Sequence, residues 1–334
     1  MKIALIILLL VIGFVLIIKG GDYFVDGASW LAEVSGVPKF IVGATIVSVA
    51  TTLPEIIVSL MTAKAQPDMA IGNAVGSVVF NSGVIMAIAL ITTPFVIKRK
   101  DYTFKSLLLI GTMALLSIFS FQGVDLKNLN FYSQGVFGYV GSAILLLIFL
   151  TFIIENVKSA KEHASLSGEE MEEKPSKDKK SVIINLLKLI LGADAIAFGA
   201  ILLKNNAVKI AEIAGVPQAV IGVTILAIGT SLPELVTMII AVKKGEASLS
   251  VGNIVGANTI DLALILPLSA FIAGGSGVPV SNLHLLITMP VTLLIVSISL
   301  IPTLINKRFS RWQGITMFAI YLAYFTFNIV YTVA

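Results

Sequence analysis

Long apolar runs dominate the chain, and short polar stretches separate them. A helix needs about 20 apolar residues to cross the hydrocarbon core of a bilayer. By this criterion the sequence predicts ten membrane-spanning helices. The first run is interpreted as a span and not as a signal peptide, because no small-residue cleavage site follows it. The predicted spans are residues 2–18, 38–63, 69–93, 104–120, 134–155, 181–203, 217–241, 248–272, 283–300 and 311–331.

The composition supports this interpretation. Hydrophobic residues make up 57% of the 334 positions and charged residues only 13%, against ~25% charged in soluble domains. So few charges cannot cover a soluble protein of this length, which excludes a cytosolic enzyme and leaves the lipid bilayer as the surrounding partner. The absence of cysteine excludes disulfides, and two histidines cannot form a His-rich metal site. The net charge of +4 is scattered over short loops, so we expect no nucleic-acid partner, and no obligate protein partner is indicated.

Loop charges predict the orientation. Lys and Arg accumulate in the cytoplasmic loops of membrane proteins. With ten spans and the N-terminus outside, 18 Lys and Arg fall on the inner side and 5 on the outer side, Lys204 and Lys209 among the latter. We therefore expect a multi-pass protein of the cell membrane with both termini outside.

The two halves of the chain repeat one another. Residues 36–62 match residues 215–241 at 10 of 27 positions, an offset of 179. Five spans in each half is an odd number, so the repeats must have opposite orientations, as in many secondary transporters. The predicted fold is an all-α integral membrane protein of ten transmembrane helices in two inverted five-helix repeats. The first repeat is residues 1–155 and the second is residues 181–334, with a polar cytoplasmic linker at 156–180.

One motif in each repeat carries the chemistry. Thr51–Glu55 reads Thr-Thr-Leu-Pro-Glu within the second span, and Thr230–Glu234 reads Thr-Ser-Leu-Pro-Glu within the seventh. Each proline frees the backbone carbonyl four residues earlier. Freed carbonyls, hydroxyls and the two glutamates make an all-oxygen cluster, which suits hard cations such as Ca²⁺ and Na⁺. A lone intramembrane glutamate can be structural, but Glu55 and Glu234 at equivalent places indicate function.

A second pair of segments lies on the third and eighth helices. Positions four residues apart share one helix face, which groups Asn73 with Ser77 and Asn81. Small-residue packing with amide hydrogen bonds is an alternative explanation for the asparagines and their neighbouring glycines. That alternative explains a buried acid poorly, so Asp261 fits a third carboxyl group at the site. The second-half counterparts are Asn253, Ala257 and Asp261.

Asp194, in the sixth span, has no acidic counterpart, because position 15 is Val. The sequence leaves three roles open for it: facing water at a gate, accepting a proton, or packing in its protonated form.

These segments resemble the repeats of the cation/calcium antiporter superfamily, specifically the prokaryotic type of its sodium/calcium exchanger branch. The resemblance spans the chain and is most specific at Gly229–Glu234, Gly-Thr-Ser-Leu-Pro-Glu. The proton/calcium branch is known for Gly-Asn-x-x-Glu. Gly72–Gly76 and Gly252–Gly256 have no acid at that place, which disfavours that branch.

The resemblance implies a set of ion ligands and no resident cofactor. Glu55 and Glu234 would be central ligands of both Ca²⁺ and Na⁺. The first and sixth helices would form a sliding pair that gates access. Further oxygens would come from Thr51, Thr52, Thr230 and Ser231, from the main-chain carbonyls near Ser48 and Ala227, from Ser77 as a sodium ligand, and from Asn81 and Asp261 in the middle of the site.

The chain departs from the family pattern at three positions. Ala257 stands where the family often has Ser, which removes one sodium ligand and leaves the ion ratio open. Ala50 replaces the Gly expected before Thr51, and should stiffen the first-half break. Asp194 is additional, and leaves proton coupling open.

The leading prediction is a secondary antiporter that exchanges Ca²⁺ for Na⁺ by alternating access. A proton-coupled or K⁺-dependent cation exchanger is the alternative, with H⁺ or K⁺ as a further transported ion. An intramembrane enzyme is disfavoured because the sequence has no His-Glu-x-x-His, no paired aspartates in adjacent helices and no Ser/His dyad. A channel would not require an inverted repeat with a carboxylate in each half.

Overall fold

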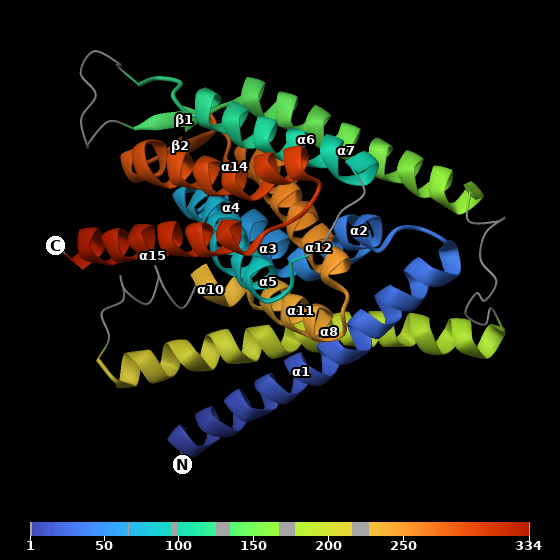
Figure 1. Ribbon diagram of the computed structural model, residues 1–334. Coiled ribbons are helices and arrows are strands. Elements are labelled where there is room, and N and C mark those ends of the chain that lie inside the picture. The colour runs from blue at the N-terminus through green and yellow to red at the C-terminus, as the bar shows by residue number, and fades with distance from the viewer. Residues whose placement is uncertain are drawn as a thin grey trace.

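The structure is a computed structural model that describes residues 2–65, 67–94, 99–124, 134–166, 178–215 and 227–333. The molecule is a bundle of helices, and both chain ends lie on the left side of Figure 1. The described residues include nine helices that are long and apolar enough to cross a membrane. The all-α membrane fold is thus confirmed, whereas the count of ten is not, because the predicted span 217–241 begins outside the described residues.

The first half contains three long spans and two that are assembled from shorter pieces. Two of these helices include a π-helical turn, in which the backbone hydrogen bonds skip one more residue than in an α-helix. The elements are α1 (Lys2–Ser35), α2 (Lys39–Val42), η1 (Gly43–Val47), α3 (Ser48–Thr62), α4 (Pro67–Phe80), η2 (Asn81–Met86), α5 (Ala87–Thr92), α6 (Arg99–Phe119), β1 (Gly135–Phe137) and α7 (Tyr139–Leu166).

The second half repeats this plan from α8 onward. Its elements are α8 (Lys179–Ile213), α10 (Ala227–Thr230), α11 (Leu232–Lys243), α12 (Ala247–Ile260), η4 (Asp261–Ile265), α13 (Leu266–Ala273), β2 (Val278–Val280), η5 (His284–Thr288), α14 (Met289–Asn306) and α15 (Arg311–Val333).

The long helices α1 and α8 pack against each other along glycine residues. A Cβ added at Gly13 would lie 3.0 Å from the carbonyl O of Gly199, and one at Gly20 would lie 2.9 Å from that of Gly192. Residue numbers therefore rise along α1 as they fall along α8, so the two helices are antiparallel. At the repeat offset Gly13 corresponds to Gly192 and Gly20 to Gly199, so α1 and α8 are equivalent helices of the two halves. Their antiparallel packing shows that the two halves are inverted.

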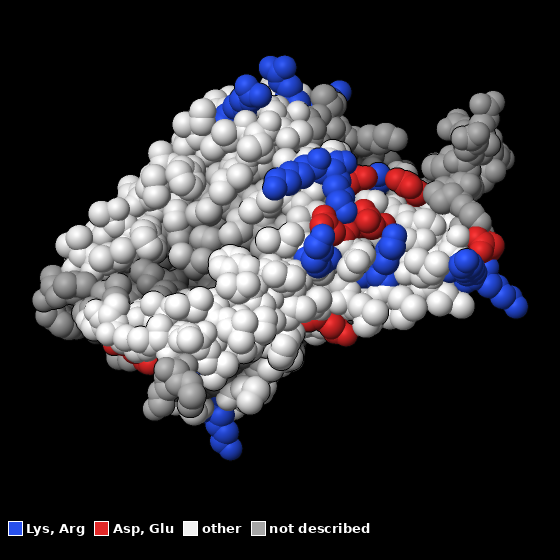
Figure 2. Space-filling view, turned by 90° about the horizontal axis from the view of Figure 1, so that it is seen from below, with Lys and Arg blue, Asp and Glu red and all other residues white. Residues whose placement is uncertain are grey.

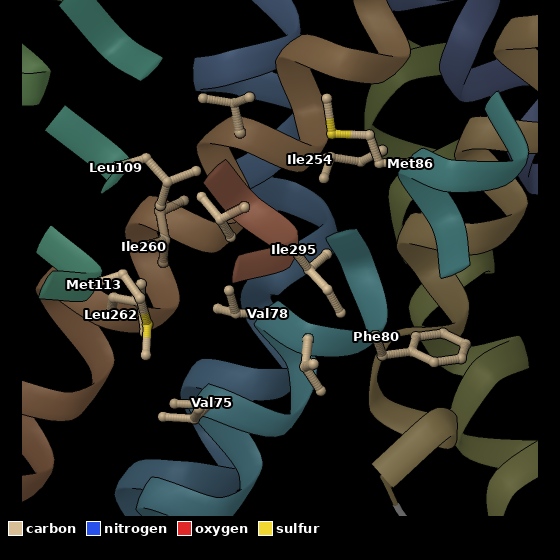
Figure 3. Close-up of a cluster of buried hydrophobic side chains, with 14 of the residues drawn as sticks. Val75, Val78, Phe80, Met86, Leu109, Met113, Ile254, Ile260, Leu262 and Ile295 are labelled. Carbon is tan, nitrogen blue, oxygen red and sulfur yellow. The ribbon is translucent and has the colours of Figure 1, made fainter. Parts of the chain in front are cut away.

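The other helices enclose one large apolar core. It includes buried side chains from α4, α6, α12 and α14, such as Val78, Met113, Ile254 and Ile295, which Figure 3 shows together. The α1–α8 pair crosses the outside of this body (Figure 1). Its outer side chains, including Leu8 and Phe198, are more than half exposed, as expected for surface that contacts lipid.

Charged residues gather at one end of the α1–α8 side. Figure 2, which views the molecule from this side, shows a broad uncharged surface with blue and red residues concentrated toward one end. Lys39 Nζ lies 2.9 Å from Glu33 Oε1 and 2.5 Å from Glu246 Oε1. Lys244 Nζ lies 2.7 Å from Asp26 Oδ1. These ion pairs join α1 and α2 of the first half to the short segment between α11 and α12 of the second half.

Several predicted boundaries are wrong. The first and sixth spans are much longer than predicted, since α1 continues to Ser35 and α8 to Ile213. The polar segment 156–180 is helical in part, because α7 runs on to Leu166 and Asn156 is buried. Residues 134–138 do not begin a helix. Instead β1 pairs antiparallel with β2, with Phe137 opposite Val278.

Candidate cation-binding site

The two motif glutamates are buried in the middle of the molecule. Glu55 lies on α3 and Glu234 on α11, and each side chain is only 1% exposed. Thr52, which lies one turn before Glu55 on α3, hydrogen-bonds to Glu234, and η4, which begins at Asp261, packs against α3. Burying several like charges together is costly unless a cation or protons compensate them. The prediction that the inverted repeats bring both glutamates together therefore agrees with the structure.

The motif hydroxyls bond across the two halves in a matched pair. Thr51 Oγ1 donates to Asn253 Oδ1 at 3.1 Å, and Thr230 Oγ1 donates to Asn73 Oδ1 at 3.3 Å. These bonds are equivalent under the repeat, so each Gly-Asn segment holds the opposite motif in place. The asparagines thus act as packing amides, the alternative that the sequence left open for them.

A third contact reaches a glutamate directly. Thr52 Oγ1 donates a hydrogen bond to Glu234 Oε1 at 3.2 Å. The first-half motif therefore supplies a hydroxyl to the second-half carboxylate. Ser231, the equivalent of Thr52, is fully buried, and its Oγ makes no hydrogen bond with a described residue.

Several buried oxygens have no hydrogen-bond partner among the described residues. Buried polar atoms in native proteins are nearly always hydrogen-bonded, so each exception needs an explanation. Oxygen atoms of this kind are the ligands that Ca²⁺ and Na⁺ prefer. Around the motifs they include both carboxylate oxygens of Glu55 and of Asp261, Glu234 Oε2, Asn81 Oδ1, Ser77 Oγ and Ser231 Oγ, and further ones lie elsewhere, such as Ser29 Oγ and Asn282 Oδ1.

The acids alone do not make a metal centre. Within the described ranges, no three His, Asp or Glu side chains are grouped closely enough to hold a metal ion. A cation held by Glu55 and Glu234 would therefore take its remaining ligands from neutral oxygens. This favours a site that releases its ion over a permanent structural metal site.

Asn81 and Asp261 occupy matching positions. Each is the first residue of a π-helical turn, Asn81 of η2 and Asp261 of η4. Such turns are rare and occur often at functional sites. Asn81 Nδ2 donates to Asn258 Oδ1 at 3.1 Å, and Asn258 Nδ2 donates to Ser82 Oγ at 2.9 Å. This amide chain joins α12 to η2 beside the acids.

Asn258 was missed in the sequence. The signal was available, because Asn258 lies three residues before Asp261 on the eighth helix, a spacing that places both on one helix face. Its neighbour Ala257 is fully buried, as is Ser77 on α4. The methyl group of Ala257 thus lies inside the protein, as does the hydroxyl of Ser77, its counterpart in the first half.

Close packing brings α12 against the first-half motif helix. A Cβ added at Gly252 would collide with the carbonyl O of Phe40, and one at Gly256 would lie 2.6 Å from that of Ala44. The predicted close approach is therefore present here. The opposite contact, from Gly72 and Gly76, would involve the equivalent residues 219–223, which lie outside the described residues.

The two motifs differ in backbone structure, and the first-half motif is the more regular one, as expected from Ala50 in place of glycine. Pro54 lies inside the continuous helix α3. In the second half the helix is interrupted at Ser231, between α10 and α11, and Pro233 lies in the first turn of α11. Proline is well tolerated in a first helical turn. The irregular backbone of the first half is instead the π-helical turn η1, upstream of the motif.

The structure describes the surroundings of one predicted carbonyl ligand, Ser48, but only part of those of the other, Ala227. Ser48 begins α3, and its carbonyl accepts a hydrogen bond from Thr51 Oγ1 at 3.4 Å, a long contact that an ion could replace. Ala227 is the first residue of α10, and the residues before it are outside the described ranges. Its carbonyl therefore stays a prediction.

Asp194 and Lys204 both lie on α8, where Asp194 was expected and Lys204 was not. Asp194 is exposed on the outer surface of the helix, which is incompatible with a buried packing role. Lys204 was counted in an outer loop, but it lies well inside α8.

Inverted helices that enclose buried carboxylates and neutral oxygens define a membrane transporter of cations. The sequence pattern of the family described as "Sodium/calcium exchanger protein" matches residues 5–157 and 184–330, and the chain belongs to this family.

Proteins similar over most of this chain include a named sodium/calcium exchanger and a membrane protein. The chain is 30% identical over 352 residues to the sodium/calcium exchanger MaX1 of Methanosarcina acetivorans, covering 95% of this chain and 96% of MaX1. It is 34% identical over 270 residues to the inner membrane protein YrbG of Escherichia coli, covering 80% of each. A solved structure of the sodium-calcium exchanger NCX_Mj, soaked with Na⁺ and Sr²⁺, matches with a TM-score of 0.79 and 27% identity, covering 96% of this chain and 98% of that one.

Proposed function

We propose that this protein exchanges Ca²⁺ for Na⁺ across the cell membrane by alternating access, with Glu55 and Glu234 as its charged ligands. The observation that carries the proposal is the pair of buried carboxylates, one from each inverted repeat, with oxygens that lack hydrogen-bond partners among the described residues. Two carboxylates neutralise one Ca²⁺ or two Na⁺. Competition for the same charges would couple the two ions.

The further ligands follow from the same geometry. Among the described residues, the hydroxyl oxygens of Ser77 and Ser231 have no hydrogen-bond partner, nor do Asn81 Oδ1 and the carboxylate oxygens of Asp261 at their π-helical turns. The remaining ligands would be the hydroxyls of Thr51, Thr52 and Thr230 and the carbonyls of Ser48 and Ala227. Thr51, Thr52 and Thr230 already hold the two motifs together, so an ion would replace or share their present hydrogen bonds.

The arrangement in the membrane forms part of the proposal. Residues 1–155 and 181–334 form the two transport repeats, and the segment 156–180 joins them on the cytoplasmic side. Both termini face outside. Lys204, counted outside, and Lys19 and Lys188, counted inside, all lie within α1 or α8, so the inward excess of positive charge is carried by the remaining loop residues. The protein acts as a transporter and not as an enzyme, and it needs no resident cofactor.

Flux into reconstituted vesicles tests the function. Purified protein is inserted into liposomes that contain Na⁺, contain K⁺ or carry a proton gradient. Uptake of radioactive Ca²⁺ into each kind is then measured with the membrane potential clamped. We expect uptake only in the Na⁺-loaded vesicles. Uptake without any counter-ion gradient would indicate a channel, and uptake driven by protons or requiring K⁺ would replace the proposal with a different exchanger. Liposomes without protein are the control.

A further inference from the structure

Lys204 lies at the depth of the membrane interior. Leu203, its neighbour on α8, lies 3.0 Å from the place of a Cβ at Gly13 of α1. On α1 every residue of the stretch 3–18 is apolar. Because α8 runs antiparallel to α1 alongside this stretch, Lys204 is level with its middle. A lysine at that depth is costly to insert into a membrane, and such residues usually have a function.

The side chain of Lys204 packs directly on the second-half motif. It lines a groove of about 280 Å³ between α1, α8, α10 and α11, with Leu10, Phe14, Ile228 and Leu232. A Cβ added at Gly229, the residue before Thr230, would lie 2.7 Å from Lys204 Cγ. The missing side chain at Gly229 thus makes room for the stem of the lysine.

The positive charge of Lys204 is carried next to the second-half motif. Gly229, on which the lysine stem packs, directly precedes Thr230 of the Thr230–Glu234 motif. Lys204 makes no ion pair with any residue in the described part of the chain, so no neighbouring acid there neutralises its charge. At the equivalent place the first half has Val25, which is fully buried, opposite Ala50. The cation is therefore a feature of one half only.

We propose that Lys204 sets the cation affinity and the ion preference of the two-glutamate site by acting as a fixed positive charge beside it. This inference rests on the proposed function. The repulsion between two charges is proportional to their product, so Lys204 opposes Ca²⁺ twice as strongly as it opposes one Na⁺. Removing the charge then tightens the binding of a single Na⁺ by some factor. It must tighten the binding of Ca²⁺ by the square of that factor. No purely structural role predicts this relation.

Equilibrium binding to purified protein tests the proposal. Lys204→Met keeps an unbranched chain in an apolar groove, Lys204→Arg keeps the charge, and Lys209→Met removes an exposed lysine farther along α8. Binding of radioactive Ca²⁺ is measured with and without competing Na⁺. We expect Lys204→Met to tighten Ca²⁺ binding about tenfold and Na⁺ binding about threefold. Lys204→Arg and Lys209→Met should remain close to the wild type.

The outcomes separate the inference from the proposed function. No Ca²⁺ binding by the wild-type protein would overturn both. The role of Lys204 alone would be overturned if the wild type binds Ca²⁺ normally and Lys204→Met shows either no change in affinity or equal changes for the two ions. The same conclusion would follow if Lys209→Met changed the affinities as much as Lys204→Met does. Lys204→Gln is measured in parallel, so that a folded uncharged variant decides the matter if the methionine variant does not fold.

Discussion

The two copies of the glutamate motif have nearly the same sequence but different backbones. Around Pro54 the chain is a continuous α-helix that follows a π-helical turn, whereas around Pro233 the helix is interrupted at Ser231. The residue preceding the motif differs as well, Ala50 in the first half and Gly229 in the second. Glycine is less favourable than alanine in a helix interior, so the interruption falls in the half that has the glycine.

This difference shows how one repeat can be used in two ways. Gly229 weakens the helix and also admits the stem of Lys204, while Ala50 packs with the apolar cluster around Val25. Both glutamates are nevertheless buried to the same degree. The halves are thus equivalent in the charge that they bring to the site and unequal in the backbone that presents it.

The largest expected effect tests the equivalence of the two carboxylates. Glu55→Gln and Glu234→Gln should each abolish Ca²⁺ exchange in vesicles, because each removes a charge from a buried site where water cannot replace it. Glu33→Gln, which alters a half-exposed glutamate outside the site, should leave exchange intact. Near wild-type exchange by either site variant would refute a site shared by both halves.

A smaller effect separates the two backbones. Gly229→Ala places a Cβ against Lys204 and should destabilise the protein by about 1–3 kcal/mol through overpacking. Ala50→Gly should cost only about 0.5–1 kcal/mol, the helix penalty of glycine. Thermal unfolding in detergent measures both, and the double variant Gly229→Ala/Lys204→Ala should recover part of the loss. A greater loss in Ala50→Gly than in Gly229→Ala would contradict this view of the halves.

The paired positions Ser77 and Ala257 sharpen the comparison further. Ala257→Ser would restore the missing hydroxyl, worth about 1 kcal/mol by analogy with a hydrogen bond. It should lower the Na⁺ concentration for half-maximal exchange several-fold and leave Ca²⁺ affinity nearly constant. Ser77→Ala, the matched variant, should raise the Na⁺ requirement. Equal shifts for both ions would mean that position 257 does not line a sodium site.

The smallest expected effect concerns Asp194, which has no acidic counterpart in the first half. Its side chain is exposed on the outer surface of α8, so Asp194→Asn should leave the exchange rate and its pH dependence unchanged. Fluxes measured on both sides of neutral pH decide this. A flattened pH profile in the variant would assign proton coupling to Asp194.

Periodic and repeated features of the sequence predicted most of the fold. Apolar run length gave the membrane class, and the repeat of Gly36–Thr62 gave the inverted halves, which the antiparallel packing of α1 and α8 confirms. The lengths of those two helices were not predictable from hydropathy. Their polar ends, from Lys19 to Ser35 and from Asn205 to Ile213, remain helical through packing rather than through apolar character.

The site was predictable where chemistry repeats and unpredictable where it does not. Glu55, Glu234, Asn81 and Asp261 occur at matched positions, and all four are buried with free oxygens. Asn258 and Lys204 have apolar counterparts, Val78 and Val25, so the repeat gave no signal for them. The unequal backbones around Pro54 and Pro233 accompany the one difference directly before the motif, Ala50 against Gly229, which the sequence did show.

Equilibrium binding of radioactive Ca²⁺ to the purified protein and its two glutamate variants tests most directly whether the halves form one site. A shared site predicts one Ca²⁺ bound per chain, its displacement by Na⁺, and loss of high-affinity binding in Glu55→Gln and in Glu234→Gln alike. Retention of wild-type affinity by either variant, or two Ca²⁺ per chain that are lost one at a time, would show that each half binds its own ion and would contradict the shared site.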